Sequence, residues 1–249
     1  MASIKLKNVS LAYPLLGSRV RRKLTAGTIE SAGELVKDSE SRSRSIHALR
    51  NITLSLSDGD RLGLVGRNGS GKSTLLRIMA EIYEPSEGRV EVQGKVASLF
   101  QVGLGINPES TGYRNIELLG LMAGYTEKEI EDLKPKIAEF SELGDYLHLP
   151  VRTYSNGMAM RLKFTCSTSF SPEILLLDEW LGAGDPSFSD RARARMRSVV
   201  DKAGILVLAT HRHKLIRKEC NKVLWLHQGN VQAYGSPMDV FEQMAEAAN

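Results

Sequence analysis

The stretch Gly66–Thr74, with the sequence GRNGSGKST, decides the fold. It matches the pattern G-x-x-x-x-G-K-[S/T] and follows an apolar segment, residues 61–65 (RLGLV), that predicts a buried strand. From Lys72 the sequence predicts a helix to about Ala80. A strand, a glycine loop and a helix in this order predict a phosphate-binding loop, because loop amides and the helix N-terminus attract anionic oxygens.

The residues of this loop have separate roles in such a site. Glycines allow the backbone to approach a phosphate closely, Lys72 supplies a positive charge, and the Ser73 hydroxyl can ligate Mg²⁺. The alternative is a chance match, which the flanking strand and helix argue against. The predicted nucleotide-binding residues of the loop are Gly66, Asn68, Gly69, Ser70, Gly71, Lys72, Ser73 and Thr74.

A second element, ILLLDE (residues 174–179), is an apolar strand that ends in two acids. In a parallel sheet the end of this strand would lie beside the phosphate loop. We predict that Asp178 holds Mg²⁺ through water and that Glu179, as a catalytic residue, polarises the attacking water. The alternative is that the two acids simply end a strand at a loop.

His211 directly follows another apolar strand, GILVLAT (residues 204–210), and is the third element of the predicted site. An imidazole at this strand end could contact a γ-phosphate, so we predict a catalytic role for it. A lone histidine is more often structural or solvated. The prediction therefore depends on the order of loop, acids and histidine along the chain.

Strands and helices alternate along most of the chain, which predicts an α/β fold with a largely parallel sheet. Two early segments, residues 3–13 and 46–56, alternate as strands, and the Ser-, Arg- and Glu-rich residues between them predict an insertion that is at most partly helical. Further strands are predicted at 88–99, 174–178, 204–209, 222–226 and 230–234, and further helices from 157, over 187–202 and from 237.

Residues 106–152 are helical in character. Thr126 and Glu129 predict a capping box, in which each side chain bonds the backbone N–H of the other residue. Pro135 is expected to break or restart its helix, because proline lacks the N–H that a helix interior needs.

Composition excludes several classes. The chain has 249 residues, of which 42% are hydrophobic and 25% charged, as in ordinary globular proteins. The net charge of +4 would suit binding to an anionic surface, but it also fits an ordinary solvated protein surface. Because the sequence has no RNA-binding aromatic signature and no zinc-finger spacing, we predict no nucleic-acid partner. No apolar stretch approaches the ~18 residues that span a bilayer. Cys166 and Cys220 suggest neither a disulfide framework nor a metal site.

Six motifs together carry a resemblance to the nucleotide-binding subunit of ATP-binding cassette (ABC) transporters, over residues 3 to about 240. In chain order they are GRNGSGKST, Gln101, YSNGM (154–158), ILLLDE, GAGD (182–185) and Ala209-Thr210-His211. The resemblance implies a P-loop NTPase fold with a mostly parallel core, an antiparallel β subdomain and a small helical subdomain. It implies one ABC ATPase domain over 1–249, with the core at 1–105 and 161–249, an insertion at about 15–46, and the helical subdomain at 106–160.

The segment YSNGM is similar to the signature of this family, which usually reads Leu-Ser-Gly-Gly-Gln. The resemblance implies that Ser155, Asn156 and Gly157 close over the γ-phosphate of an ATP bound to a second copy, in a head-to-tail homodimer. Exposed amides at a helix start are suited to this role. The alternative is an ordinary helix cap.

Three more roles follow from the resemblance alone. Gln101 would sense Mg²⁺ and the transmembrane partner, and Asp185 would contact the opposite subunit at the nucleotide site. Tyr13 resembles the aromatic residue that stacks on adenine, although a buried or loop tyrosine is a serious alternative there.

The departures from the general pattern, including Asn156, Met158 and Trp180, resemble the branch that exports lipid-linked polysaccharides such as O-antigen, capsule and teichoic acid. That resemblance implies an ATPase that uses ATP and Mg²⁺ at the cytoplasmic face of the inner membrane. Its partners would be two copies of a polytopic transmembrane subunit and, indirectly, a lipid-linked glycan. The alternatives are an ABC transporter for another cargo or a soluble ABC ATPase without a transport role.

Overall fold

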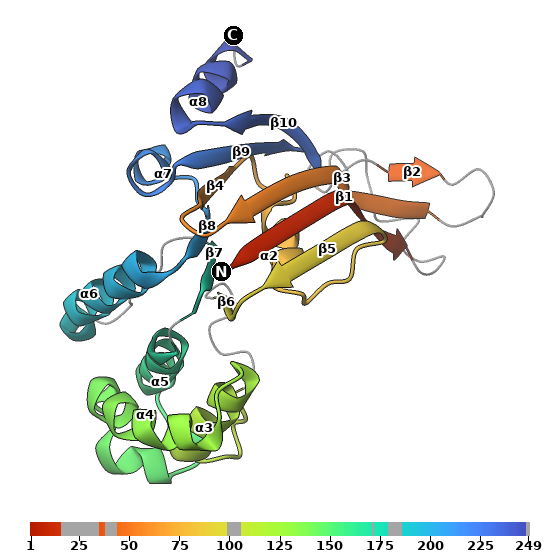
Figure 1. Ribbon diagram of the computed structural model, residues 1–249. Coiled ribbons are helices and arrows are strands. Elements are labelled where there is room, and N and C mark those ends of the chain that lie inside the picture. The colour runs from red at the N-terminus through yellow and green to blue at the C-terminus, as the bar shows by residue number, and fades with distance from the viewer. Residues whose placement is uncertain (16–34, 38–43, 99–105, 171, 179–185, 248–249) are drawn as a thin grey trace. The chain divides into compact units, whose positions relative to one another are not determined.

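The computed structural model describes residues 1–15, 35–37, 44–98, 106–170, 172–178 and 186–247 (Figure 1). The chain divides into two compact units, which are described separately. The first unit comprises 1–94, 176–180 and 204–249, and the second comprises 95–175 and 181–203.

The first unit contains an antiparallel sheet with the strand order β2-β3-β1-β5. Its strands are β1 (Ser3–Leu15), β2 (Leu35–Lys37), β3 (Arg44–Ser57) and β5 (Glu87–Gln93). The predicted alternation in β3 is confirmed, since Ile52, Leu54 and Leu56 are buried between exposed neighbours. Strand β2 falls within the segment predicted to be an insertion that is at most partly helical, where the sequence predicted no strand. The early part of β3 offers an open edge, and β2 pairs with it.

A second sheet has the strand order β10-β9-β4-β8-β7-β6. Strand β4 pairs in parallel with both β8 and β9, as the alternation of strands and helices predicted. Strands β9 and β10 form an antiparallel hairpin whose turn contains Gln228 and Gly229, both with positive φ. The strands are β4 (Arg61–Val65), β6 (Val96–Ser98), β7 (Ile174–Asp178), β8 (Ile205–Ala209), β9 (Lys222–His227) and β10 (Asn230–Gly235).

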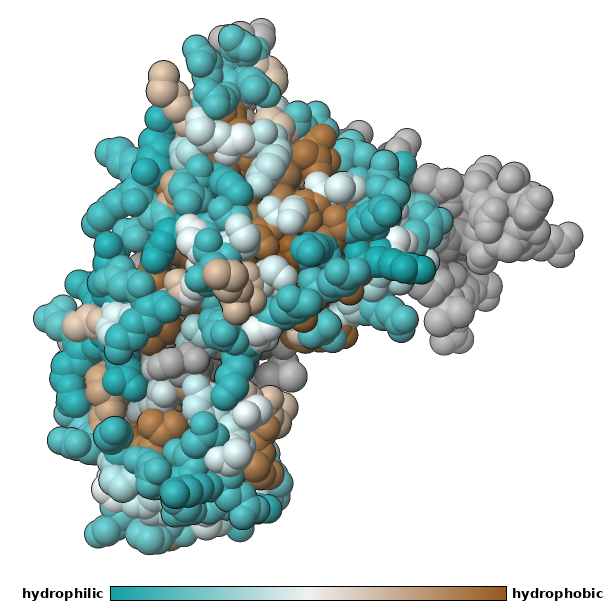
Figure 2. All heavy atoms as spheres, viewed as in Figure 1, coloured by the Kyte–Doolittle hydropathy of each residue, from teal (hydrophilic) through white to brown (hydrophobic). Residues whose placement is uncertain are grey.

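Helix α2 (Lys72–Met79) contacts strands of both sheets: β3 and β5 of the first and β8 of the second. Its apolar side chains, Leu75, Leu76, Ile78 and Met79, have no exposed surface. Burial on both sides fixes the helix and therefore the loop that leads into it. Two further helices, α7 (His213–Glu219) and α8 (Pro237–Glu246), pack against each other, and α8 also contacts β9 and β10. The surface seen in Figure 2 is mainly hydrophilic, with apolar side chains in separate patches.

The second unit is mainly helical. Its α-helices are α3 (Gly112–Met122), α4 (Glu127–Ser141), α5 (Asn156–Ser169) and α6 (Pro186–Lys202), and two 3₁₀ helices span Gly144–His148 and Val151–Thr153. Its core includes Ile116, Ile137, Leu147 and Leu162. The predicted capping box at Thr126 and Glu129 is confirmed.

Pro135 does not break its helix, so that prediction is wrong. It lies inside α4, which continues for six more residues to Ser141. The side chains of Ile130 and Ile137, on either side of the proline, are buried and hold both halves of the helix on the same core. Pro135 itself is exposed, so water can bond the carbonyl group that the missing N–H leaves without a partner.

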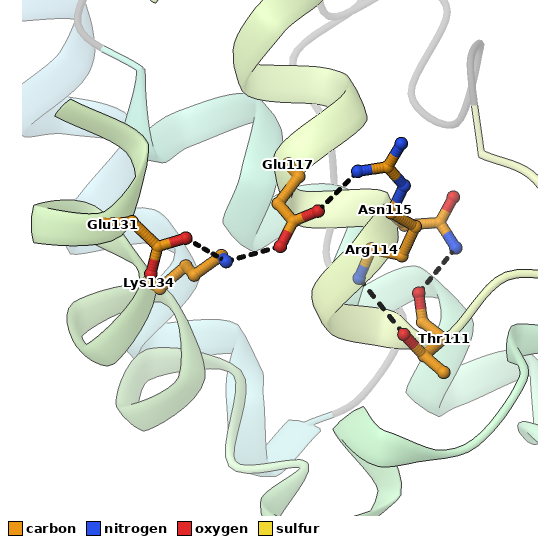
Figure 3. A network of polar contacts seen from close by, with 6 residues as sticks. All are labelled: Thr111, Arg114, Asn115, Glu117, Glu131 and Lys134. Atoms are coloured by element: carbon orange, nitrogen blue, oxygen red, sulfur yellow. Dashed lines mark hydrogen bonds and ion pairs between the residues drawn. The ribbon is translucent and has the colours of Figure 1, made fainter. Parts of the chain in front are cut away.

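A polar network joins α3 to α4 and to the segment before α3 (Figure 3). The ammonium of Lys134 on α4 lies 2.5 Å from a carboxylate oxygen of Glu117 on α3. Asn115 on α3 is fully buried, and its side chain bonds the backbone of Asn107, Ser110 and Thr111. A buried amide that satisfies so many backbone groups fixes the entry into α3, because any other conformation would leave those groups without partners.

Candidate functional site

A pocket of about 590 Å³ in the first unit brings together three sequence segments that were predicted to bind nucleotide. Its volume lies in the range of small-molecule sites. The phosphate loop comes from the turn between β4 and α2, Asp178 from the end of β7, and His211 from the residues after β8. The residues that line the pocket are Tyr13, Ala48, Asn68, Gly69, Ser70, Gly71, Lys72, Ser73, Thr74, Asp178 and His211.

The loop needs glycine at two positions for steric reasons. Gly71 has φ +106°, and a Cβ there would lie 2.7 Å from the carbonyl oxygen of Ala48. Gly66 has φ +146°, and a Cβ there would lie 2.2 Å from the carbonyl oxygen of Leu226. Both distances are shorter than any tolerated contact, so a side chain at either position would displace the loop.

Lys72 is the first residue of α2, directly after the loop, and is only 8% exposed. Its ammonium donates to the carbonyl oxygens of Gly66 at 2.7 Å and Arg67 at 3.0 Å. The N-cap of α2 is Gly71, which has no side-chain oxygen to cap the first amides, and the first turn of α2 contains no acid. A buried cation and uncapped amides together form a site for an anion.

Ser73 and Asp178 meet on one side of this anion site. The Ser73 hydroxyl donates to a carboxylate oxygen of Asp178 over 2.6 Å. These two oxygens suit Mg²⁺, which prefers hard oxygen ligands and keeps several waters: the Ser73 hydroxyl could ligate the ion directly and Asp178 through a water. Among the described residues no three His, Cys, Asp or Glu side chains gather as a metal site, so a cation here would take its other ligands from water and phosphate.

Tyr13 lies at the edge of the pocket, beside Thr74. Burial raises the pKa of the Tyr13 phenol, and a hydrogen bond with the Thr74 side chain partly offsets that effect. The phenol is therefore neutral at physiological pH. Tyr13 is 38% exposed, so part of the residue is open to a ligand.

His211 also lines an adjoining cavity with residues of the phosphate loop and of the β9–β10 turn. Its position is fixed by the end of β8, where the Thr210 hydroxyl accepts from the Arg212 amide over 3.2 Å. His211, Asp178 and the phosphate loop therefore line the same pocket, as their positions beside predicted strands indicated.

The predicted signature residues belong to the second unit. Ser155 is the N-cap of α5, and its hydroxyl accepts from the amide of Met158 over 3.2 Å. Ser155, Asn156 and Gly157 are exposed, and a Cβ at Gly157 would have no contact closer than 3.9 Å. This geometry is a regular helix cap whose start is open to a ligand. None of these three residues lines the pocket of the first unit.

Three other predicted site residues, Gln101, Glu179 and Asp185, lie outside the residues that the structure describes.

Sequence reasoning missed two residues that contact the phosphate loop, Gly229 and Ala48. The Gly229 amide donates to the Ser70 carbonyl oxygen over 3.1 Å, and its own carbonyl accepts from the Arg50 amide over 2.9 Å. A Cβ at Gly229 would lie 2.8 Å from the carbonyl oxygen of Ala48, which lines the pocket. The sequence indicates a turn at 228–229, but no local signal predicts that this turn packs under the phosphate loop.

Comparisons with known proteins show the family of this chain. The family model described as "ABC transporter" matches residues 49–182. The O-antigen export system ATP-binding protein RfbE of Yersinia enterocolitica is 42% identical over 240 residues, which are 96% of this chain and 100% of that protein. The teichoic acids export ATP-binding protein TagH of Shouchella clausii is 38% identical over 83% of this chain, which spans 57% of that protein.

Among solved structures, a dimeric ATP-binding cassette in a post-hydrolysis state, bound to ADP and phosphate, matches 94% of the chain with a TM-score of 0.65 and 22% identity. The chain belongs to the ABC transporter family, as an ATP-binding subunit with ATPase activity. Among the described residues, no helix combines the length and apolar character that a bilayer crossing requires.

Proposed function

We propose that this chain hydrolyses ATP to drive export of a lipid-linked polysaccharide across the cytoplasmic membrane. The observation that carries the proposal is the 42% identity to the O-antigen export protein over that protein's whole length. The similarity to a teichoic acid export protein supports the same class of cargo. Export of another cargo is the second candidate, since the phosphate pocket itself carries no information about what is moved.

Each copy would bind ATP with the pocket of its first unit. The phosphate loop and Lys72 hold the β- and γ-phosphates, and Tyr13 stacks on the adenine. Ser73 and Asp178 would hold Mg²⁺, which neutralises charge on the β- and γ-phosphate oxygens. Glu179 polarises the attacking water, and His211 contacts the γ-phosphate.

Two copies would complete each other's sites. The exposed start of α5 at Ser155, Asn156 and Gly157 supplies amides but no positive side chain, which suits a γ-phosphate already bound to a lysine on a second copy. In the head-to-tail homodimer, Asp185 contacts the opposite subunit, and ATP favours the closed dimer because it binds that state more tightly. Hydrolysis removes this preference and releases the two copies.

The helical segment 106–160 would transmit the closure and release of the dimer to the transmembrane subunit. Gln101 would contact a short cytoplasmic helix of a polytopic transmembrane subunit, present in two copies. The chain would thus act peripherally, at the cytoplasmic face of the membrane, and would not itself bind the glycan.

A deletion strain tests the cargo. Loss of the gene is expected to leave lipid-linked glycan inside the cell, and the wild-type gene should restore export while a Lys72→Ala variant should not. A polytopic membrane protein should co-purify with both forms. If surface glycan is unchanged in the deletion strain while another exported compound is lost, the second candidate is correct.

The proposed Mg²⁺ role of Asp178 makes a separate prediction. Asp178→Asn should keep the fold, because an amide can still accept from Ser73. It should raise the Mg²⁺ concentration for half-maximal ATPase activity by about 10- to 100-fold. The control is Asp190→Asn, whose side chain is 92% exposed on α6. An unchanged Mg²⁺ dependence in Asp178→Asn would exclude the carboxylate as a ligand.

A further inference from the structure

A second tyrosine contacts the proposed adenine-stacking residue from outside the pocket. The ring centroids of Tyr13 and Tyr83 lie 6.2 Å apart with an interplanar angle of 82°, an edge-to-face pair. Tyr83 does not line the pocket, whereas Tyr13 does. The guanidinium carbon of Arg77 lies 5.7 Å from the centroid of the Tyr83 ring. Arg77, Tyr83 and Tyr13 therefore form a row of side chains that ends at the nucleotide pocket.

The backbone around Tyr83 is fixed by the end of helix α2. The Ile82 and Tyr83 amides both donate to the Arg77 carbonyl, and the Glu81 amide donates to that of Ile78. Glu81 has φ 56°, in the left-handed region. This is the Schellman arrangement, in which the chain turns back over the last turn of the helix. Because that turn involves the Arg77 carbonyl, it also brings Tyr83 back over the side chain of Arg77.

The next residues attach this turn to strand β1. The Ser86 amide donates to the Ser10 carbonyl over 2.8 Å, and the Ser86 hydroxyl accepts from the Ala12 amide over 3.0 Å. Ala12 precedes Tyr13, so the side chain of Ser86 is bonded to the backbone next to Tyr13, while the Ser86 backbone is bonded to that of Ser10. The Tyr13 hydroxyl hydrogen-bonds with the side chain of Thr74, in the first turn of α2, and with the side chain of Tyr83.

Helix α2 therefore determines both the phosphate site and the position of the Tyr13 ring. Its start supplies Lys72, Ser73 and Thr74 to the pocket, and its end supplies Arg77 and leads into the turn that carries Tyr83. A ring held at its hydroxyl and along one side loses little rotational freedom when a base stacks on it, so less binding free energy is lost to ordering.

We infer that Tyr83, supported by Arg77, is a positioning residue that holds the Tyr13 ring for the nucleobase and so strengthens binding of the base without touching it. This rests on the proposed function, in which Tyr13 stacks on adenine. Tyr83 should contribute to affinity for a nucleotide but not to affinity for a triphosphate without a base. A residue that only stabilised the fold around the pocket would affect both ligands alike.

The test compares two probes on the purified chain with Mg²⁺: the non-hydrolysable ATP analogue AMP-PNP and inorganic tripolyphosphate, with binding measured by calorimetry. Tyr83→Leu, which keeps an apolar side chain but removes the ring, should bind AMP-PNP about three- to tenfold more weakly and tripolyphosphate as the wild type does. The matched variant Tyr83→Phe keeps the ring and removes only the hydroxyl that bonds Tyr13, so it should weaken AMP-PNP less than Tyr83→Leu does and leave tripolyphosphate binding within about twofold of the wild type. In a Tyr13→Ala background, Tyr83→Leu should cause no further loss.

Arg77→Met gives a second measurement that leaves both tyrosines in place, in case Tyr83→Leu does not fold. It should weaken AMP-PNP about two- to fivefold and leave tripolyphosphate unchanged. The inference is overturned if Tyr83→Leu binds AMP-PNP like the wild type, or if it loses affinity for both probes equally, while Tyr13→Ala still weakens AMP-PNP. If the wild type itself binds AMP-PNP no better than tripolyphosphate, adenine stacking by Tyr13 fails as well.

Discussion

A mixture of two inactive variants, Lys72→Ala and Ser155→Arg, is expected to regain ATPase activity that neither variant has alone. In a head-to-tail dimer each site combines the phosphate loop of one copy with the start of α5 from the other. A mixed dimer therefore has one site with both defects and one site with neither. With random pairing, and if one intact site is enough for turnover, about a quarter of the wild-type activity should return.

Each variant alone should lose activity for a different reason. Lys72→Ala removes the buried cation of the loop, so ATP affinity itself should fall. Ser155→Arg leaves the loop intact, so ATP should bind normally while turnover falls by about 100-fold or more, because an arginine at this exposed helix start prevents closure over the γ-phosphate. Met122→Arg, which adds the same side chain at a 67% exposed position of the same unit, should be active. A mixture that stays inactive would exclude shared sites.

Replacement of Glu179 by Gln is expected to lower the hydrolysis rate by about 10²- to 10⁴-fold without weakening ATP binding. The amide keeps the size of the side chain but cannot polarise the attacking water. Since hydrolysis normally ends the closed state, the variant should also accumulate as an ATP-bound dimer, which gel filtration with ATP would detect as a shift to twice the mass.

The control for this variant is Glu139→Gln at an exposed position of α4, which should leave turnover and oligomeric state unchanged. Near-normal hydrolysis by Glu179→Gln would exclude this residue as the base. A variant that loses both hydrolysis and ATP binding would indicate that Glu179 acts on the nucleotide itself and not on the water.

Most of the fold could be predicted because its signals are local. The strand at 61–65, the helix from Lys72 and the strand at 174–178 occur where the periodicity of apolar residues indicates them. One error arose where tertiary contacts overrode a local preference: Pro135 is tolerated because core packing on both sides holds α4 together. No pattern in the sequence indicated the strand at residues 35–37, which forms because β3 offers an edge.

The sequence by itself determined which groups line the phosphate pocket, because the loop, the carboxylate and the histidine each lie next to a strand or helix with a clear local pattern. Only the tertiary structure decided what supports that pocket. Gly229 lies under the loop from 159 residues further along the chain than Ser70, and Tyr83 meets Tyr13 only because a turn at the end of α2 is bonded to β1. Such contacts depend on how separate elements pack against each other. Residues far apart in sequence share no local pattern from which their contact could be predicted.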